Sequence, residues 1–219
     1  MIAQVNSTAL LGIDGYIVDV ESDISNGLPA FDIVGLPDAS VKESKERIRA
    51  AIKNSGLVMP SKRITVNLAP ADIKKEGAHF DLSIAVGILA ASEQLPKLSK
   101  SSIFLGELSL NGDLRRINGV LPMVISAYQR GITTVYLPEE NAKEAAVIEG
   151  MTVYGAKSLK DIVLHITNQK KIERHSIGET EKLSREKIRE FDFKDVKGQP
   201  FVKRALEIAA AGGHNILIV

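Results

Sequence analysis

Two hydrophobic periods alternate along most of this chain, and the alternation limits the folds open to it. From Ile2 to Leu36, short runs of β-branched and apolar residues typical of strands are interrupted by Gly12, Gly27 and Pro29. The period then becomes helical, and strand-like and helix-like stretches follow one another to about residue 167. Strands interleaved with helices predict an α/β or α+β fold with a mixed sheet.

The first helical stretch, PDASVKESKERIRAAIKNSG, has both a start and a stop signal. Asp38 or Ser40 can cap its N-terminus, and Gly56 can end it. Its apolar stripe consists of Val41, Ile48, Ala51 and Ile52. A second helix, over about residues 80–93, is apolar nearly all round, which is typical of a helix buried at the centre of a domain.

The clearest local signal is IFLGELSLNGDLRRI, two strand-like runs joined by Asn111-Gly112. This dipeptide tolerates the positive φ of a tight hairpin turn. The elements expected around the hairpin are a strand RITVNLAP before it and, after it, a helix over about 119–130, a strand TTVYLP, a short helix ENAKEAAVIEG, a strand MTVYG and a helix from Ser158.

Composition excludes several classes of function. Of the 219 residues, 44% are apolar, enough for a real core. Lys and Arg (28) nearly balance Asp and Glu (27), so any basic binding site must be local. The absence of cysteine excludes disulfides, thiol catalysis and cysteine metal sites. No stretch approaches the roughly 20 apolar residues of a membrane span, and no signal peptide is visible, so we expect a cytoplasmic protein that does not bind membranes.

The pattern divides the chain into a first domain over 1–167, a linker over 168–190 and the start of a second domain over 191–219. The linker is rich in both charges and poor in large apolar groups, and a solvated helix is an equal alternative there. In the last segment Val202, Ala205, Leu206 and Ala209 share one helical face. Gly212-Gly213 ends that helix, and NILIV predicts a short buried strand.

The last segment, VKGQPFVKRALEIAAAGGHNILIV, resembles the entry to the ATPase domain of magnesium-chelatase-like AAA+ proteins, specifically the ComM/YifB family. GLPAFDIVGLPD, KRITVNLAPADIKKEGAHFDLSIAVGIL and FLGELSLNGDLRRINGVLP resemble that family's N-terminal domain, so the resemblance covers the whole chain. It implies a hexameric, ATP-driven motor acting on single-stranded or branched DNA, with branch migration during DNA uptake and recombination as its role.

In that family a glycine-rich phosphate loop follows the strand that NILIV resembles. The sequence has no G-x-x-x-x-G-K-[ST] motif, so we expect a chain cut before this loop that does not hydrolyse ATP alone. The resemblance implies ATP and Mg²⁺ as cofactors of the native-length protein and none in this chain. It also places Gly198 and Gln199 of VKGQ beside the adenine, where we expect weak or undetectable ATP binding.

The N-terminal domain also resembles the Lon-protease fold, in which a serine nucleophile works with a lysine base. Overlaying the motifs puts His79 of KEGAHFDL at the serine position and Leu121 of GDLRRINGVLP at the lysine position. Because leucine cannot accept a proton, this pair cannot form a Ser-Lys dyad. The resemblance therefore argues against proteolysis, and we expect no catalytic residue.

Two short segments are candidates for DNA contacts. Lys74 and Lys75 lie in a loop at the mouth of the expected buried helix, where free backbone N–H groups could help to hold a phosphate. Arg115 and Arg116 lie on the expected hairpin and could present two guanidiniums. The alternatives are a capped turn with solvated lysines and strand arginines that face water. If the two segments meet at one end of the domain, their charges form a single patch.

The remaining candidates are weaker. The four histidines, His79, His165, His175 and His214, have no metal-ligand spacing, so we expect no metal site and a hydrogen-bonded, structural role for His79. A second hypothesis makes the domain a protein-interaction module of a protein-remodelling AAA+ ATPase. The near-zero net charge favours this hypothesis, because DNA-binding domains are often visibly basic.

Overall fold

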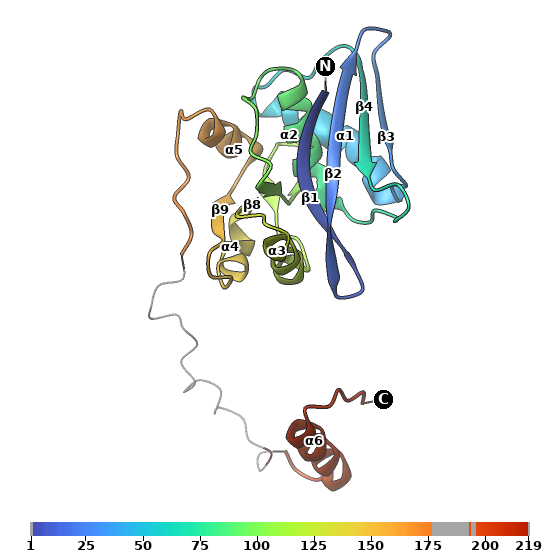
Figure 1. Cartoon of the computed structure of the whole chain (residues 1–219), viewed down its shortest axis with the longest axis vertical. Coiled ribbons are helices and arrows are strands. Elements are labelled where there is room, and N and C mark those ends of the chain that lie inside the picture. The colour runs from blue at the N-terminus through green and yellow to red at the C-terminus, as the bar shows by residue number, and fades with distance from the viewer. Residues whose placement is uncertain (1, 177–192, 194–195, 219) are drawn as a thin grey trace. The chain divides into compact units, whose positions relative to one another are not determined.

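The structure, a computed structural model, describes residues 2–176, 193 and 196–218 (Figure 1). It divides into two compact units, Met1–Ser176 and Ile177–Val219, which are described separately.

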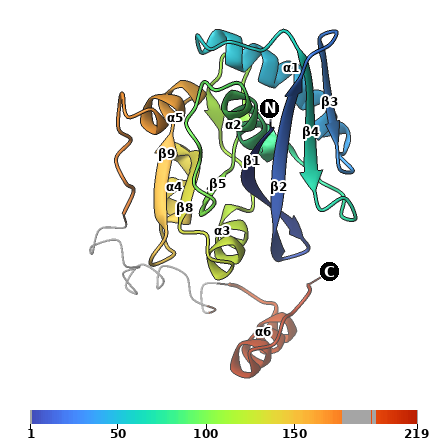
Figure 2. The same cartoon turned by 45° about the horizontal axis from the view of Figure 1, so that its top comes forward.

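The first unit is built on a seven-stranded sheet in the order β3-β4-β2-β1-β5-β8-β9 (Figures 1 and 2). These strands are β1 (Ile2–Leu11), β2 (Asp14–Ser25), β3 (Ala30–Val34), β4 (Arg63–Ala69), β5 (Ser102–Phe104), β8 (Thr134–Pro138) and β9 (Thr152–Ala156). Strand β2 is antiparallel to both of its neighbours, and the other neighbouring strands pair in parallel. The sheet is therefore mixed and helices connect its parallel strands, which confirms the predicted α/β class.

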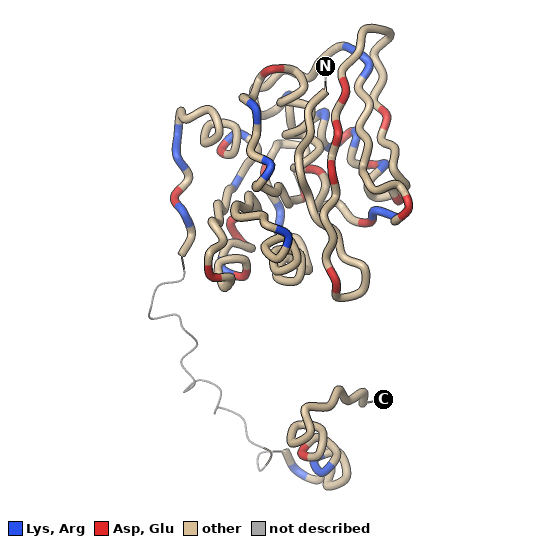
Figure 3. The backbone as a smooth tube through the Cα atoms, viewed as in Figure 1, with Lys and Arg blue, Asp and Glu red and all other residues tan. Residues whose placement is uncertain are grey.

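Strands β1 and β2 form a long hairpin whose register runs from Ile2↔Asp23 to Leu11↔Asp14. Successive side chains of β2 point to opposite faces of the sheet. Val18 and Val20 are fully buried, whereas Asp19 and Glu21 lie on the other face and are half-buried. Acidic positions recur along β2 (Figure 3), and Asp19, Glu21 and Asp23 are spaced two residues apart, so this part of β2 has an acidic face.

Helices cover both faces of the sheet (Figures 1 and 2). One core cluster contains residues of α1 (Ala39–Asn54), α2 (Asp81–Ala91) and α5 (Leu159–Ile166), and the other contains residues of α3 (Val120–Gln129) and α4 (Glu139–Ala145). The predicted start of α1 is confirmed, because Asp38 Oδ1 accepts a hydrogen bond from the Val41 N–H at 2.7 Å. The predicted stripe of Val41, Ile48, Ala51 and Ile52 is buried. Ser158 caps α5 in the same way through the Asp161 N–H.

Helix α2 lies at the centre of the first unit. Of its 11 residues, ten are buried, which confirms the expectation from its all-round apolar sequence. Leu82, Ile84 and Ile88 are fully buried, and each contributes about 1.5–3 kcal/mol through burial. A short 3-10 helix, η1 (Ala78–Phe80), leads into α2.

The predicted hairpin forms as a separate two-stranded sheet of β6 (Glu107–Leu108) and β7 (Leu114–Arg115). Its turn is wider than the two-residue turn that Asn111-Gly112 suggested. The Ser109 N–H donates to the Asp113 carbonyl at 2.9 Å, and in the loop between them only Gly112 has a positive φ, 88°. Gly112 fits tightly against α1, since a Cβ there would lie 2.3 Å from Ser55 Oγ.

The beginning of the predicted linker packs on the first unit. The Ile172 N–H donates to His165 Nδ1 at 2.9 Å, and the His175 N–H donates to the carbonyl of Val153 in β9 at 2.9 Å. The compact unit therefore extends to residue 176. Residues 177–190 of the predicted linker lie outside the described residues.

The second unit contains α6 (Pro200–Gly212), which ends at Gly213 in the left-handed conformation, as the sequence predicts. Its expected apolar face is only partly covered, because Ala209 is buried whereas Val202 and Leu206 are half-buried and Ala205 is exposed. The strand predicted from NILIV is wrong for residues 215–218, which form no strand and leave Leu217 86% exposed. A strand needs a neighbour for its backbone groups, and the described part of this unit offers none.

Candidate nucleic-acid interface

The two predicted basic segments lie at the same edge of the sheet. Strands β4 and β5 are both parallel to β1, so their carboxyl ends point in one direction. The loop of residues 70–77 follows β4, and the hairpin β6–β7 follows β5. Helix η1 ties the two together, because the Gly106 N–H donates to the His79 carbonyl at 2.9 Å and the Leu82 N–H donates to the Gly106 carbonyl at 3.0 Å.

Lys74 and Lys75 have opposite environments. Lys74 is exposed, and its Nζ lies 2.7 Å from Glu76 Oε1, a hydrogen bond that raises the pKa of Lys74. Lys75 is fully buried and its Nζ donates to the Ile73 carbonyl at 2.7 Å. Burial lowers the pKa of Lys75. The expectation that both lysines face a phosphate is therefore corrected: Lys75 is turned inward, and only Lys74 faces solvent.

The backbone around Lys75 explains its orientation. The Lys75 N–H donates to the Leu36 carbonyl at 3.0 Å, and the Asp38 N–H donates to the Lys75 carbonyl at 2.9 Å. The loop is thus fixed as a parallel bridge against the segment that precedes α1. Along an extended backbone, neighbouring side chains point to opposite sides, so an exposed Lys74 leaves Lys75 pointing into the domain.

Arg115 and Arg116 are both exposed. The Arg115 Nη1 lies 3.4 Å from Glu107 Oε1 across the hairpin. Arg116 forms no ion pair with any residue that the structure describes. Of the four predicted DNA-contacting residues, three are therefore exposed to solvent at this edge: Lys74, Arg115 and Arg116.

The segment after the hairpin is held by a residue that the sequence analysis missed. Asn141 of α4 is fully buried, its Oδ1 accepts from the Ile117 N–H at 3.0 Å, and its Nδ2 donates to the Ile117 carbonyl at 2.9 Å. This two-way bond positions the chain directly after Arg116. The sequence did not reveal this contact, because Asn141 and Ile117 are 24 residues apart.

His79 is buried, with Nε2 3.0 Å from the Thr8 carbonyl. Burial lowers the pKa of His79 to about 4, so the ring is neutral at pH 7. Because a carbonyl can only accept, Nε2 carries the proton. These contacts fit the hydrogen-bonded, structural role expected for His79, and a neutral buried ring makes a poor phosphate ligand and a weak base.

Leu121 is half-buried at the start of α3, and its N–H donates to Glu144 Oε1 at 3.0 Å. Its side chain has no proton to exchange with His79. The two positions that the Lon resemblance selected therefore supply neither a hydroxyl nor an amine.

An ion pair joins α1 to α2 near this edge, between half-buried Arg47 and fully buried Asp81. Arg47 donates to Asp81 through Nε at 2.9 Å and through Nη2 at 3.2 Å, and Asp81 Oδ2 also accepts from the Leu108 N–H at 3.2 Å. Burial raises the pKa of Asp81 to about 6, against the opposing effect of Arg47. Asp81 thus links two helices to the hairpin that carries Arg115.

At the mouth of α2, where the sequence suggested free N–H groups, two of these groups already have partners. The Asp81 N–H donates to the Ala78 carbonyl, and the Leu82 N–H donates to the Gly106 carbonyl. The Asp81 carboxylate adds a negative charge at the same place. A phosphate at this edge would therefore rely on side chains.

Gly198 and Gln199 precede α6 in the second unit. Both have left-handed backbone conformations, with φ of 69° and 58°, and both are exposed. The Lys203 N–H donates to the Gln199 carbonyl at 3.0 Å, and the Lys203 Nζ donates to the Val196 carbonyl. This places a defined turn at VKGQ.

Among the described residues, no group of three or more histidine, aspartate or glutamate side chains could hold a metal ion. None of the helices in that part of the chain is long and apolar enough to cross a membrane.

Comparison with known proteins gives consistent matches. The family model "Subunit ChlI of Mg-chelatase" matches residues 20–141, and "Magnesium chelatase, subunit ChlI" matches residues 192–219. The chain is 42% identical to Competence protein ComM of Haemophilus influenzae over 229 residues, which cover all of this chain and 43% of that protein. It is 41% identical to the uncharacterized protein YifB of Escherichia coli over 217 residues, covering 98% of this chain and 42% of that protein.

A weaker match joins the chain to Lon protease 2 of Bacillus subtilis, with 26% identity over 168 residues, 72% of this chain and 30% of that protein. The chain spans less than half the length of the ComM and YifB relatives. The predicted resemblances to the ComM/YifB family and to Lon are confirmed.

Proposed function

Because this chain belongs to the magnesium-chelatase subunit ChlI family, we propose that it is the N-terminal part of a ComM/YifB-type AAA+ ATPase that moves DNA. The observation that carries the proposal is the 42% identity, along the whole chain, to a protein named for competence. The proposed role is branch migration during DNA uptake and recombination, by a cytoplasmic, hexameric ring. This chain would supply DNA contacts or ring geometry.

ATP and Mg²⁺ are the cofactors proposed for the native-length protein. The residues present do not fit them, since the sequence has no phosphate-loop motif and the described residues include no metal-binding cluster. Gly198 and Gln199 would contribute at most part of an adenine pocket. The proposed hydrolysis is therefore assigned to the native-length protein and to no residue of this chain.

We propose that Lys74, Arg115 and Arg116 contact DNA phosphates. The first two are paired with Glu76 and Glu107 in ion pairs at the surface, where solvent screens the attraction between the charges. A phosphate can compete with partners held so weakly. Lys75 is left out of the set because its ammonium is buried.

The DNA surface is tested by fluorescence anisotropy with single-stranded and branched DNA. The variant carries Lys74→Glu, Arg115→Glu and Arg116→Glu, and we expect it to lose affinity and to show a shallower salt dependence, because fewer counterions are released. The control carries Lys62→Glu, Lys160→Glu and Lys171→Glu, which change the net charge equally at exposed positions elsewhere. If both variants lose the same DNA affinity, the loss comes from the change in net charge, and the proposed DNA-binding surface is wrong.

The motor itself is tested on the native-length protein, by measuring ATP hydrolysis with and without branched and single-stranded DNA. Stimulation by DNA supports the proposal. A rate of ATP hydrolysis that is the same with and without each DNA would favour the second candidate, a protein-interaction module of a protein-remodelling ATPase. The acidic face of β2 (Figure 3) favours that candidate, because it would repel phosphates.

A further inference from the structure

Strand β1 is paired along one edge and largely open along the other. All ten residues of β1 pair with β2. On the opposite edge, the described residues pair with β1 at one position only, Asn6↔Ile103 of β5. The Asn6 Nδ2 also donates to the Lys100 carbonyl at 2.7 Å. Residues 2–4 therefore keep a free strand edge of about 10 Å, at roughly 3.3 Å per residue.

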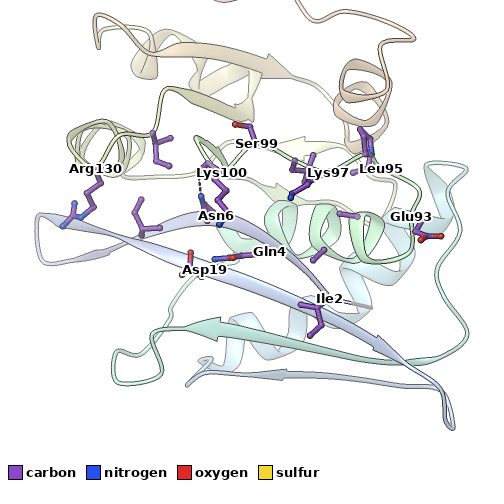
Figure 4. Close-up of a pocket in the computed structure, with 16 residues that line it drawn as sticks. Ile2, Gln4, Asn6, Asp19, Glu93, Leu95, Lys97, Ser99, Lys100 and Arg130 are labelled. Atoms are coloured by element: carbon purple, nitrogen blue, oxygen red, sulfur yellow. Dashed lines mark hydrogen bonds between the residues drawn. The ribbon is translucent and has the colours of Figure 1, made fainter.

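A groove of about 700 Å³ runs along this edge (Figure 4). Ala3 and Ala90 line it from the face of the sheet that carries α2. Gln4, Asn6 and Asp19 line it from the other face. A cavity lined from both faces of one strand must open onto the edge of that strand, where its unpaired backbone groups lie.

The opposite wall is the segment from Leu95 to Lys100 (Figure 4). Leu95 is buried and supplies an apolar floor, whereas Lys97 and Lys100 are exposed. Neither lysine forms an ion pair with any residue that the structure describes. A third cation, Arg130, lies beyond Asn6 in the same groove, and the acidic groups of the lining are Asp19 and Glu93.

We propose that this groove binds an extended segment of a partner protein, which adds as a strand to residues 2–4 of β1. Backbone groups of the strand supply affinity in such binding, and pockets for alternate side chains supply specificity. The apolar floor fits an aliphatic side chain, and the two lysines fit a carboxylate beside it. The partner segment is therefore extended, with alternating apolar and acidic residues.

The proposal is tested with an acetylated and amidated hexapeptide of alternating valine and glutamate. Titrated into the ¹⁵N-labelled chain, it should shift the amide signals of residues 2–6, 95 and 97–100. It should also slow hydrogen exchange at alternate residues of β1, because every second N–H faces the groove. No binding at millimolar concentration, or shifts that map elsewhere, would overturn the proposal.

Two control peptides separate strand addition from general attraction. N-methylation at alternate residues removes the backbone donors, and replacement of glutamate by lysine reverses the charge. We expect each change to weaken binding at least tenfold. If the N-methylated peptide binds as well as the parent, the groove holds side chains only and strand addition is wrong.

Two double variants of the chain are compared. The groove variant carries Lys97→Glu and Lys100→Glu and should lose at least tenfold in peptide affinity. The control variant carries Lys160→Glu and Lys171→Glu outside the groove and should keep its affinity. Their DNA affinity is measured in parallel, because the groove lysines are not in the proposed DNA surface. A failure of one proposal therefore leaves the other standing.

Discussion

Asp81→Asn tests whether burial or the ion pair with Arg47 controls the charge of Asp81. A pair of charges about 4 Å apart gains on the order of 4 kcal/mol at an effective dielectric constant of about 20, which favours the carboxylate. Taking an ion out of water costs several kcal/mol, which favours the neutral acid. Burial is the larger effect here, and it raises the pKa of Asp81 from its ordinary 3.8 to about 6.

The sign of the pH dependence follows from this pKa. Between about pH 4 and pH 6, the folded chain holds a proton on Asp81 that the unfolded chain has released. The stabilisation is complete below pH 4 and is lost as the pH rises through 6. A pKa difference of about two units corresponds to about 3 kcal/mol of unfolding free energy.

The assay is urea unfolding of the parent chain and of Asp81→Asn, followed by far-ultraviolet circular dichroism between about pH 4.5 and 7.5. Subtracting the two free energies of unfolding cancels the other titrating groups. We expect the parent to lose about 2 kcal/mol relative to the variant across this range. A difference that stays flat, or that changes in favour of the parent as pH rises, would show that Arg47 outweighs burial and would refute the reasoning.

Two further substitutions test the packing of this edge. Lys75→Met removes a buried ammonium and one hydrogen bond, so we expect the free energy of unfolding in urea to change by about 1 kcal/mol or less. The affinity for DNA, measured by anisotropy, should stay unchanged. A loss of DNA affinity equal to that of Lys74→Met would show that Lys75 reaches the DNA. Gly112→Ala places a Cβ 2.3 Å from Ser55 Oγ at a φ of 88° and should lower the free energy of unfolding by about 2–3 kcal/mol. The control is Gly131→Ala, which should lower it by about 1 kcal/mol because Gly131 has a similar φ of 86° and a Cβ there would have nothing within 4 Å. Equal losses in the two variants would contradict the close contact at Gly112.

Local signals predicted most of the first unit. The Asp38 cap, the stripe of α1 and the all-round apolar sequence of α2 each depend on residues within one element, and each is confirmed. The hairpin was found from Asn111-Gly112, although the turn is wider than expected. Such features are visible in sequence because period and capping act over a few residues.

The parts that were missed depend on distant partners. Nothing beside Lys75 in the sequence shows that the Leu36 carbonyl fixes its backbone and turns it inward. The pairing of Arg47 with Asp81 joins two helices 34 residues apart. The strand expected from NILIV has the right composition, but a strand exists only where another strand accepts its hydrogen bonds.

The segment that follows α5 covers part of the outer edge of the sheet. Strand β9 is the last strand of its sheet, and the His175 N–H bonds to the carbonyl of Val153 on its outer edge. A bare edge of this kind can pair with another copy of the chain and start aggregation. Ending the chain at residue 167 would remove this cover, whereas ending it at residue 176 would keep it. The shorter piece should therefore precipitate at lower concentrations, even though the fully buried residues of both core clusters precede residue 167.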